Sequence, residues 1–190
     1  MTGFRTDLAF AHVDPVPLAD ALGRLAATPA APALWRAQGL HAQAEILRDL
    51  GATARADALV AGLGYITRWS VVGPFDNEGR GGFARAFAPE SARGDALSAD
   101  LRYDGLQQRP IGWRPLPAIT RLGYVPLDPV VRPSVNACAY AHTTLTAPQD
   151  APATLWLGAT GAVAAWVNGV EVYRDEAVRR AAPDRAGVAM

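Results

Sequence analysis

The spacing of hydrophobic residues changes once along the chain, near residue 65, and this change limits the folds that the chain can adopt. Before that point apolar residues recur at intervals of three and four, which is the period of a helix face. After it, short runs of aromatic and β-branched residues lie between turn residues, as strands do. The sequence therefore predicts two domains, a helical segment over residues 1–64 and a β domain over residues 65–190.

Two helices over residues 33–64 form a predicted helical hairpin within the first segment. The first of them carries apolar residues at helical spacing: Leu34, Ala37, Leu40, Ala44, Leu47 and Leu50. Gly51 follows where a left-handed C-cap would end this helix, and Gly62 would end the second. Such a hairpin resembles one unit of a helical-repeat array. Because one unit cannot bury its own apolar face, we expect the hairpin to pack on a neighbour.

The clearest turn signal in the β domain is Asn168-Gly169, which separates the runs "VAAWV" and "VEVY". A two-residue type I′ turn needs positive φ at both central residues, and Asn-Gly meets that need. In a regular hairpin Ala165 would face Val172, and Trp166 and Tyr173 would share the opposite face. Many short strands without βαβ alternation favour an antiparallel β-sandwich. The predicted fold class is mainly β with an N-terminal α-helical hairpin.

Charge and composition argue against several classes of partner. Acidic and basic residues balance at 18 each, so the chain has no net positive charge that would attract nucleic acid or an anionic membrane. Every basic residue is Arg, which removes Lys as a Schiff-base nucleophile. The single cysteine, Cys138, excludes a disulfide within the chain and a Cys-rich zinc site.

Two features of the sequence bear on localisation. Residues 1–20 lack the long apolar core of a signal peptide, since His12, Asp14 and Pro15 interrupt it. No run of 18 apolar residues is present, so no membrane span is expected. The sequence as written predicts a cytoplasmic chain, and the compartment stays open.

Several stretches, taken together and in order, carry a family resemblance. They are "WSVVGPFDNEGRGGFARAFAPE", "GWRPLP", the run from Ala139 to Tyr173, and "RRAAPDRAGVAM" at the end of the chain. Residues 33–190 resemble the galactose-binding-like (jelly-roll) accessory module beside the transglutaminase-like domain of large bacterial multidomain proteins. In such proteins helical repeats of tetratricopeptide type often precede the module, as the hairpin over 33–64 does here.

The sequence departs from the family pattern in two ways. The family continues with a further strand, so the chain is expected to be a fragment that lacks at least one strand after Met190. The Cys-His-Asp machinery of the transglutaminase-like domain is not matched by this sequence, and none of that activity is carried over.

The loop "GPFDNEGRGGF" offers oxygen ligands at Asp76, Asn77 and Glu78. Carboxylates and carbonyls on a turn suit Ca²⁺, and jelly-roll modules of this broad class often hold a structural calcium ion. However, the spacing fits no EF-hand, and Arg80 disfavours a cation. The alternative is a solvated loop in which the glycines permit the turns. No other cofactor is expected.

A catalytic Cys-His pair is disfavoured by the spacing of its members. On one strand Cys138 and His142 share a face but lie about 13 Å apart along it. That separation prevents His142 from activating the thiol, and His12 or His41 would have to come from elsewhere in the fold. No catalytic residue is therefore assigned, and Cys138 is interpreted as a small core residue.

Three aromatic residues are the candidate ligand-binding residues. If Leu155 and Leu157 face the core, then Trp156, Trp166 and Tyr173 form a row on the other face. An exposed aromatic row would stack sugar rings, whereas a row that faces a second sheet would be core.

The function expected from these observations is that of a non-catalytic accessory module. Such a module would bind a glycan or a neighbouring protein domain, or would orient a partner domain. The alternatives are a purely structural docking piece of a multidomain protein and a hydrolase that uses loop carboxylates such as Asp76 and Glu78. A hydrolase would need paired carboxylates at a defined separation.

Overall fold

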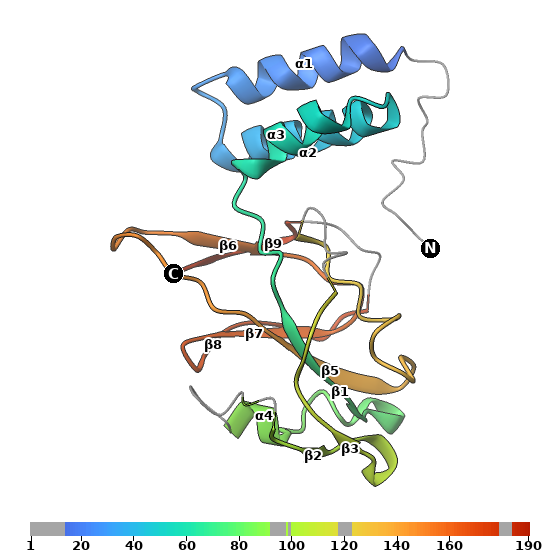
Figure 1. The fold of residues 1–190 in the computed structure, drawn as a ribbon. Coiled ribbons are helices and arrows are strands. Elements are labelled where there is room, and N and C mark those ends of the chain that lie inside the picture. The colour runs from blue at the N-terminus through green and yellow to red at the C-terminus, as the bar shows by residue number, and fades with distance from the viewer. Residues whose placement is uncertain (1–13, 92–97, 99, 118–122, 179–183) are drawn as a thin grey trace. The chain divides into compact units, whose positions relative to one another are not determined.

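The computed structural model describes residues 14–91, 98, 100–117, 123–178 and 184–190. The chain divides into two compact units, which Figure 1 displays with their elements labelled. The helical unit comprises Met1–Thr67 and Arg121–Tyr124, and the sheet unit comprises Arg68–Thr120 and Val125–Met190.

Three helices build the helical unit: α1 (Pro15–Ala27), α2 (Ala33–Asp49) and α3 (Thr53–Ala61). Asp14 caps α1, because its Oδ1 accepts a hydrogen bond of 3.0 Å from the backbone N–H of Val16. Gly51 has φ of 80°, so the predicted left-handed residue after α2 is confirmed. The α1 helix packs against α2, and α2 packs against α3 (Figure 1). The expected hairpin of α2 and α3 thus has a neighbour within the described chain.

The core of the helical unit is made of alanine and aliphatic side chains. Ala44, Leu47 and Ala56 are buried, and Ala52, Leu59 and Val60 pack around them. Leu50, expected on the same apolar face, is 47% exposed because it follows the last turn of α2 as the C-cap residue. Gly39 is buried instead, since α1 approaches that side of α2 so closely that a Cβ there would lie 3.3 Å from the Leu22 carbonyl oxygen.

Every strand pair that the structure describes is antiparallel. One sheet has the order β4 (Arg114–Pro115), β1 (Ser70–Asp76) and β5 (Ala137–His142). Three two-stranded sheets pair β2 (Tyr103–Asp104) with β3 (Pro110–Ile111), β6 (Thr154–Leu157) with β9 (Ala186–Ala189), and β7 (Val163–Val167) with β8 (Val170–Asp175). Antiparallel pairing after residue 65 is confirmed, whereas the jelly-roll sandwich stays a prediction.

Short helical turns connect these strands. They are the 3-10 turn η1 (Glu78–Arg80), the helix α4 (Ala88–Ser91) and the 3-10 turn η2 (Leu106–Gln108). None of the described helices combines the length and apolar character needed to cross a lipid bilayer.

One buried cluster of the sheet unit forms on one face of β1 and β5. Val72 pairs with Tyr140 and Phe75 pairs with Cys138, so these four side chains share a face. Trp113 is buried against Val72 and Phe75. Five hydrophobic residues pack against the cluster without being fully buried: Phe87, Tyr103, Ile111 and, within β5, Cys138 and Tyr140. The strand β1 thus supplies two of the three buried residues of this aromatic cluster, Val72 and Phe75.

The β7–β8 hairpin has the predicted turn but not the predicted register. Asn168 and Gly169 have φ of 50° and 80°, and Val167 pairs with Val170. Beyond the turn, however, Trp166 pairs with Glu171 and Ala165 pairs with Tyr173, so Val172 is an extra residue in a β-bulge. The expectation that Ala165 faces Val172 is therefore wrong.

Candidate functional site

Trp156 in β6 presents an indole ring that a neighbouring strand holds in place. Its partner across the pair is Gly187 of β9. A Cβ built on Gly187 would lie 2.8 Å from both Cζ3 and Cη2 of the indole, so the ring lies directly over the glycine. Trp156 is nevertheless 41% exposed to solvent. The result is a flat apolar surface that is supported by backbone on one side and open to solvent.

The opposite face of this strand pair is turned toward the interior. Leu155 and Leu157 are half-buried, and Val188, which pairs with Leu155, is buried. Leu155 and Leu157 therefore lie on the more buried face of β6, and Trp156 lies on the exposed face.

Trp166 and Tyr173 do not share a face, which corrects the expected aromatic row. Cross-strand partners point to the same side of a sheet, so Trp166 lies with Glu171 and Tyr173 lies with Ala165 on the other side. The bulge at Val172 causes the difference, because one extra residue moves every later side chain to the opposite face. Trp166 is 38% exposed and Tyr173 is half-buried.

The same bulge brings a charged pair onto the face of Trp166. In a regular strand Glu171 and Arg174 would point to opposite sides, yet here Arg174 donates from Nε and Nη2 to the two carboxylate oxygens of Glu171, at 2.9 and 2.7 Å. This hydrogen bonding lowers the pKa of Glu171 and raises the pKa of Arg174. The guanidinium carbon of Arg174 also lies 5.0 Å from the centre of the Phe83 ring. The surroundings of Trp166 are thus charged.

The polar side chains at the start of the loop after β1 accept hydrogen bonds from the backbone of the same loop and so stabilise its conformation. Asp76 Oδ1 accepts from the backbone N–H of Glu78 at 2.9 Å, and Asn77 Oδ1 accepts from that of Gly82 at 3.0 Å. A Cβ on Gly82 would lie 2.1 Å from the Asp76 carbonyl oxygen, so the loop closes tightly on its glycine. Within the described residues no group of three or more His, Cys, Asp or Glu side chains could hold a metal ion. Calcium binding at Asp76, Asn77 and Glu78 stays a prediction.

Cys138 lies in the aromatic cluster, where its surroundings disfavour the thiolate. Burial raises the pKa of the thiol, and the nearby carboxylates of Asp76 and Glu90 raise it further. Tyr140, two residues along β5, donates a short hydrogen bond from its hydroxyl to Glu90 Oε1 of α4. Burial, and then this bond, raise the pKa of the phenol. A thiol in such a place is a poor nucleophile.

The histidines considered as partners of Cys138 have other surroundings. His142 has its ring 6.1 Å from the Trp113 ring, measured between centres, and burial lowers its pKa. His41 Nδ1 lies 2.6 Å from the Tyr65 hydroxyl within the helical unit. His12 lies outside the described residues. No Cys-His pair is therefore brought together among the residues that the structure describes.

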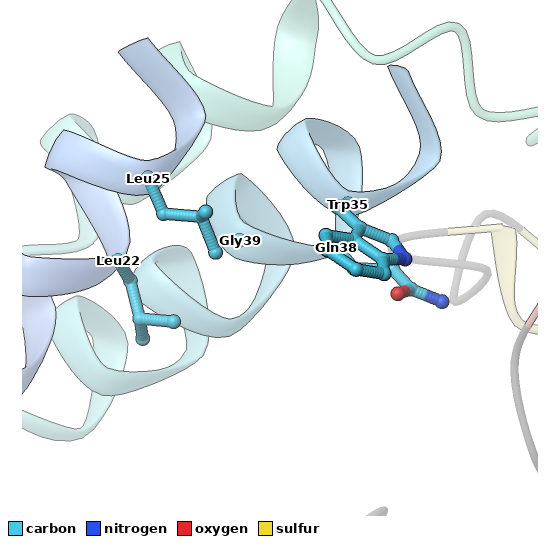
Figure 2. A pocket seen from close by; sticks show the side chains of 5 residues that line it. All are labelled: Leu22, Leu25, Trp35, Gln38 and Gly39. Atoms are coloured by element: carbon cyan, nitrogen blue, oxygen red, sulfur yellow. The ribbon is translucent and has the colours of Figure 1, made fainter. Parts of the chain in front are cut away.

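A second exposed apolar surface lies in the helical unit, between α1 and α2 (Figure 2). It is an open groove of about 290 Å³, lined by Leu22, Leu25, Trp35, Gln38 and Gly39. Trp35 is 58% exposed. Figure 2 shows Leu25 of α1 beside Gly39, with Trp35 and Gln38 projecting on the other side. The sequence could have indicated that Trp35 is exposed, because this residue lies outside the positions that were predicted to form the apolar face of its helix.

Comparison of the chain with protein-family models, with curated proteins and with solved structures gave no match. Function must therefore be argued from the geometry of the site, since a fold by itself does not determine a function.

Proposed function

We propose that the sheet unit is a non-catalytic accessory module of the galactose-binding-like (jelly-roll) kind, and that it binds a glycan at Trp156. The observation that carries the proposal is the indole of Trp156, fixed over Gly187 and exposed on its outer side. Two strands position this ring, so little conformational entropy is lost when a ligand stacks on it.

The chemistry of an exposed indole suits a sugar. One face of a pyranose ring carries mainly C–H groups, which pack against an aromatic face while the hydroxyl groups stay in water. Trp offers a large apolar area together with a negative π face that attracts the polarised C–H groups. Thr154, on the same outer face of β6 as Trp156, is exposed and offers a hydroxyl group beside the ring.

The family resemblance gives this binding a context. Residues 33–190 resemble modules that lie beside transglutaminase-like domains, and a glycan-binding module would hold such a catalytic domain near a polysaccharide surface. The loop carboxylates offer less support for a hydrolase, because Asp76 is engaged in closing its own turn. A small cavity of the sheet unit, which Leu106, Arg109 and Arg132 line, does not include Asp76 or Glu78.

A glycan array probed with the full chain tests the proposal. We expect binding to one class of neutral glycan by the wild-type chain, and loss of that signal in Trp156→Ala. The variant Trp35→Ala is the matched control, since it removes an even more exposed indole from the helical unit and should bind as the wild type does. Equal binding by Trp156→Ala, or no binding by the wild-type chain, would contradict the proposal.

A second candidate function is docking, which the groove between α1 and α2 favours. An apolar groove with a Trp that is 58% exposed is suited to stacking against another helical repeat. Fusion of a consensus tetratricopeptide hairpin ahead of Pro15 should then raise the melting temperature of the helical unit. Trp35→Ala should abolish the gain, and an equal gain in that variant would exclude docking at this groove.

A further inference from the structure

A small cavity in the sheet unit combines an apolar wall with two arginines. It has a volume of about 180 Å³ and lies where β1, η2 and β3 meet the turn at residues 132–133. Its apolar lining includes Leu106, Pro110, Ile111 and Pro133, and its polar lining includes Arg109 and Arg132. Both arginines precede a proline in the sequence, so a stiff apolar ring adjoins each guanidinium group.

The wall formed by η2 and β3 is held tightly in place. Gly105 lies so close to β1 that a Cβ there would be 2.8 Å from the Pro74 carbonyl oxygen and from Ile111 Cδ1. The backbone N–H of Gly105 donates to the Arg109 carbonyl at 2.9 Å, and Gln108 N–H donates to the Gly105 carbonyl at 3.0 Å. The cavity is therefore formed before any ligand arrives, which lowers the entropic cost of binding.

The two guanidinium groups lack anionic partners. Among the described residues neither Arg109 nor Arg132 has a side-chain hydrogen bond or ion pair, and no carboxylate lines the cavity. Two other arginines of the same unit are engaged: Arg114 donates to the carbonyls of Gly73 and Val130, and Arg174 pairs with Glu171. The cavity thus holds two guanidinium groups that form no ion pair with a carboxylate of the described residues.

We propose that this cavity binds a small organic carboxylate. The planar fork of a guanidinium group matches the two oxygens of a carboxylate, and two such groups at one cavity would hold the charged end of the ligand. The compact body of the ligand would lie against Leu106, Ile111 and the prolines. The volume is below the usual range of sites for drug-sized molecules, about 300–1,000 Å³, so a single ring or a short chain fits best.

A carboxylate of this size could belong to an acidic sugar or to a small apolar acid, and the probes separate these sources. The ¹⁵N-labelled full chain is titrated with sodium glucuronate and with sodium cyclohexanecarboxylate, and separately with their neutral counterparts glucose and cyclohexylmethanol. We expect at least one carboxylate to shift, in a saturable way, the amide signals of Leu106, Gln107, Ile111 and Arg132. The neutral counterparts should leave those signals unchanged.

Substitution of the arginines identifies the charged groups. Arg109→Gln and Arg132→Gln should each lower the affinity for the carboxylate at least tenfold. In the double variant, saturable shifts should no longer be seen. Both side chains are exposed, so the fold should persist, and unchanged amide signals elsewhere in the spectrum verify this. Arg55→Gln, which removes an exposed charge from α3, is the matched control and should bind as the wild type does.

Two outcomes would overturn the inference: neither carboxylate shifts these signals, or the affinity is the same in the double variant. Binding of glucuronate alone would assign an acidic sugar, and binding of cyclohexanecarboxylate alone would assign an apolar acid. The Trp156→Ala variant should bind the carboxylate normally, since the cavity does not include β6. Failure of the glycan proposal and failure of the carboxylate proposal are therefore separate results.

Discussion

Gly73 shows how a single residue decides the local path of the chain. It lies within β1 at φ of 151°, where the strand bulges opposite Ala139. A Cβ at this position would lie 2.9 Å from Ala139 Cβ and 3.1 Å from the Cys138 carbonyl oxygen. The neighbouring atoms belong to a strand backbone and to a short side chain, so they cannot rotate away. Only glycine fits both the conformation and the space.

Gly73→Ala should therefore lower the free energy of unfolding of the sheet unit by more than about 1 kcal/mol, since Ala fits neither the φ angle nor the gap. Urea denaturation followed by circular dichroism measures the change. Gly161→Ala in the same unit is the control, because nothing lies within 4 Å of its Cβ position. It should change stability by less than about 0.5 kcal/mol. Equal stability of the two variants would contradict this account of Gly73.

Cys138 and Tyr140 make the stability of the sheet unit depend on pH in the alkaline range. Both groups have a pKa in the folded chain above their ordinary values of 9.0 and 10.0. In the unfolded chain each therefore loses its proton at lower pH than in the folded chain. The unfolded state then binds fewer protons, so the free energy of unfolding falls as pH rises through this range.

We expect the urea midpoint to be constant between pH 7 and pH 8 and to fall between about pH 9 and pH 11, since this is where the unfolded thiol and phenol ionise. The double variant Cys138→Ala, Tyr140→Phe should show a smaller fall over the same range. Tyr124→Phe, at an exposed tyrosine, should keep the wild-type profile. A double variant with an undiminished fall would assign the pH dependence to other groups.

At the scale of elements, the β7–β8 hairpin depends on its two turn residues. Asn168 adopts φ of 50°, which costs about 1–2 kcal/mol for a residue that cannot make local hydrogen bonds. The turn also fixes the pairing of Val167 with Val170 and hence the start of the register.

Asn168→Val should therefore destabilise the sheet unit by about 1–2 kcal/mol, because a β-branched side chain disfavours positive φ. Asn168→Gly should be tolerated within about 0.5 kcal/mol. Val170→Thr, at an exposed position beside the turn, is the control and should be near neutral. Thermal unfolding ranks the three variants, and an unaffected Asn168→Val would mean that the turn does not limit stability.

Elements that depend on local signals were predictable from the sequence. The helices α2 and α3, the glycine after α2 and the Asn-Gly turn each follow from residues within a few positions of one another. Alternation along β6 is also local, but it left open whether the face of Trp156 is exposed or packs on a second sheet.

Elements that depend on distant residues were not predictable. No local pattern indicates that β6 pairs with β9, so the support of Trp156 by Gly187 was missed. The bulge at Val172 was missed because it depends on packing along the whole hairpin rather than on turn chemistry. Arg109 and Arg132 had one sequence signal, the repeated Arg-Pro dipeptide, but only the fold brings them to one cavity.

At the scale of the whole molecule, the two units have separate cores. Ala44, Leu47 and Ala56 form one buried cluster, and Val72, Phe75 and Trp113 form another, with no residue in common. Each cluster is built from its own secondary structure elements. The sheet unit spans a length typical of an independent domain.

Residues 68–190 should therefore fold when expressed without the helical unit, because the buried cluster of Val72, Phe75 and Trp113 lies entirely within them. The ¹H–¹⁵N spectrum of this piece should overlay with the corresponding signals of the full chain, apart from residues near the cut. The piece 14–67 serves as the reciprocal test through its helical circular dichroism. Collapsed, poorly dispersed signals from residues 68–190 would show that the sheet unit requires the helices.

The extra residue at Val172 has a consequence for evolution of the hairpin. A deletion of that one codon would leave Trp166 opposite Glu171 and Ala165 opposite Tyr173, so the inward and outward pattern would survive unchanged. An insertion in β8 beyond the bulge would instead move the later side chains of the strand to the opposite face. A related hairpin without the bulge would therefore align correctly only with a one-residue gap at this position.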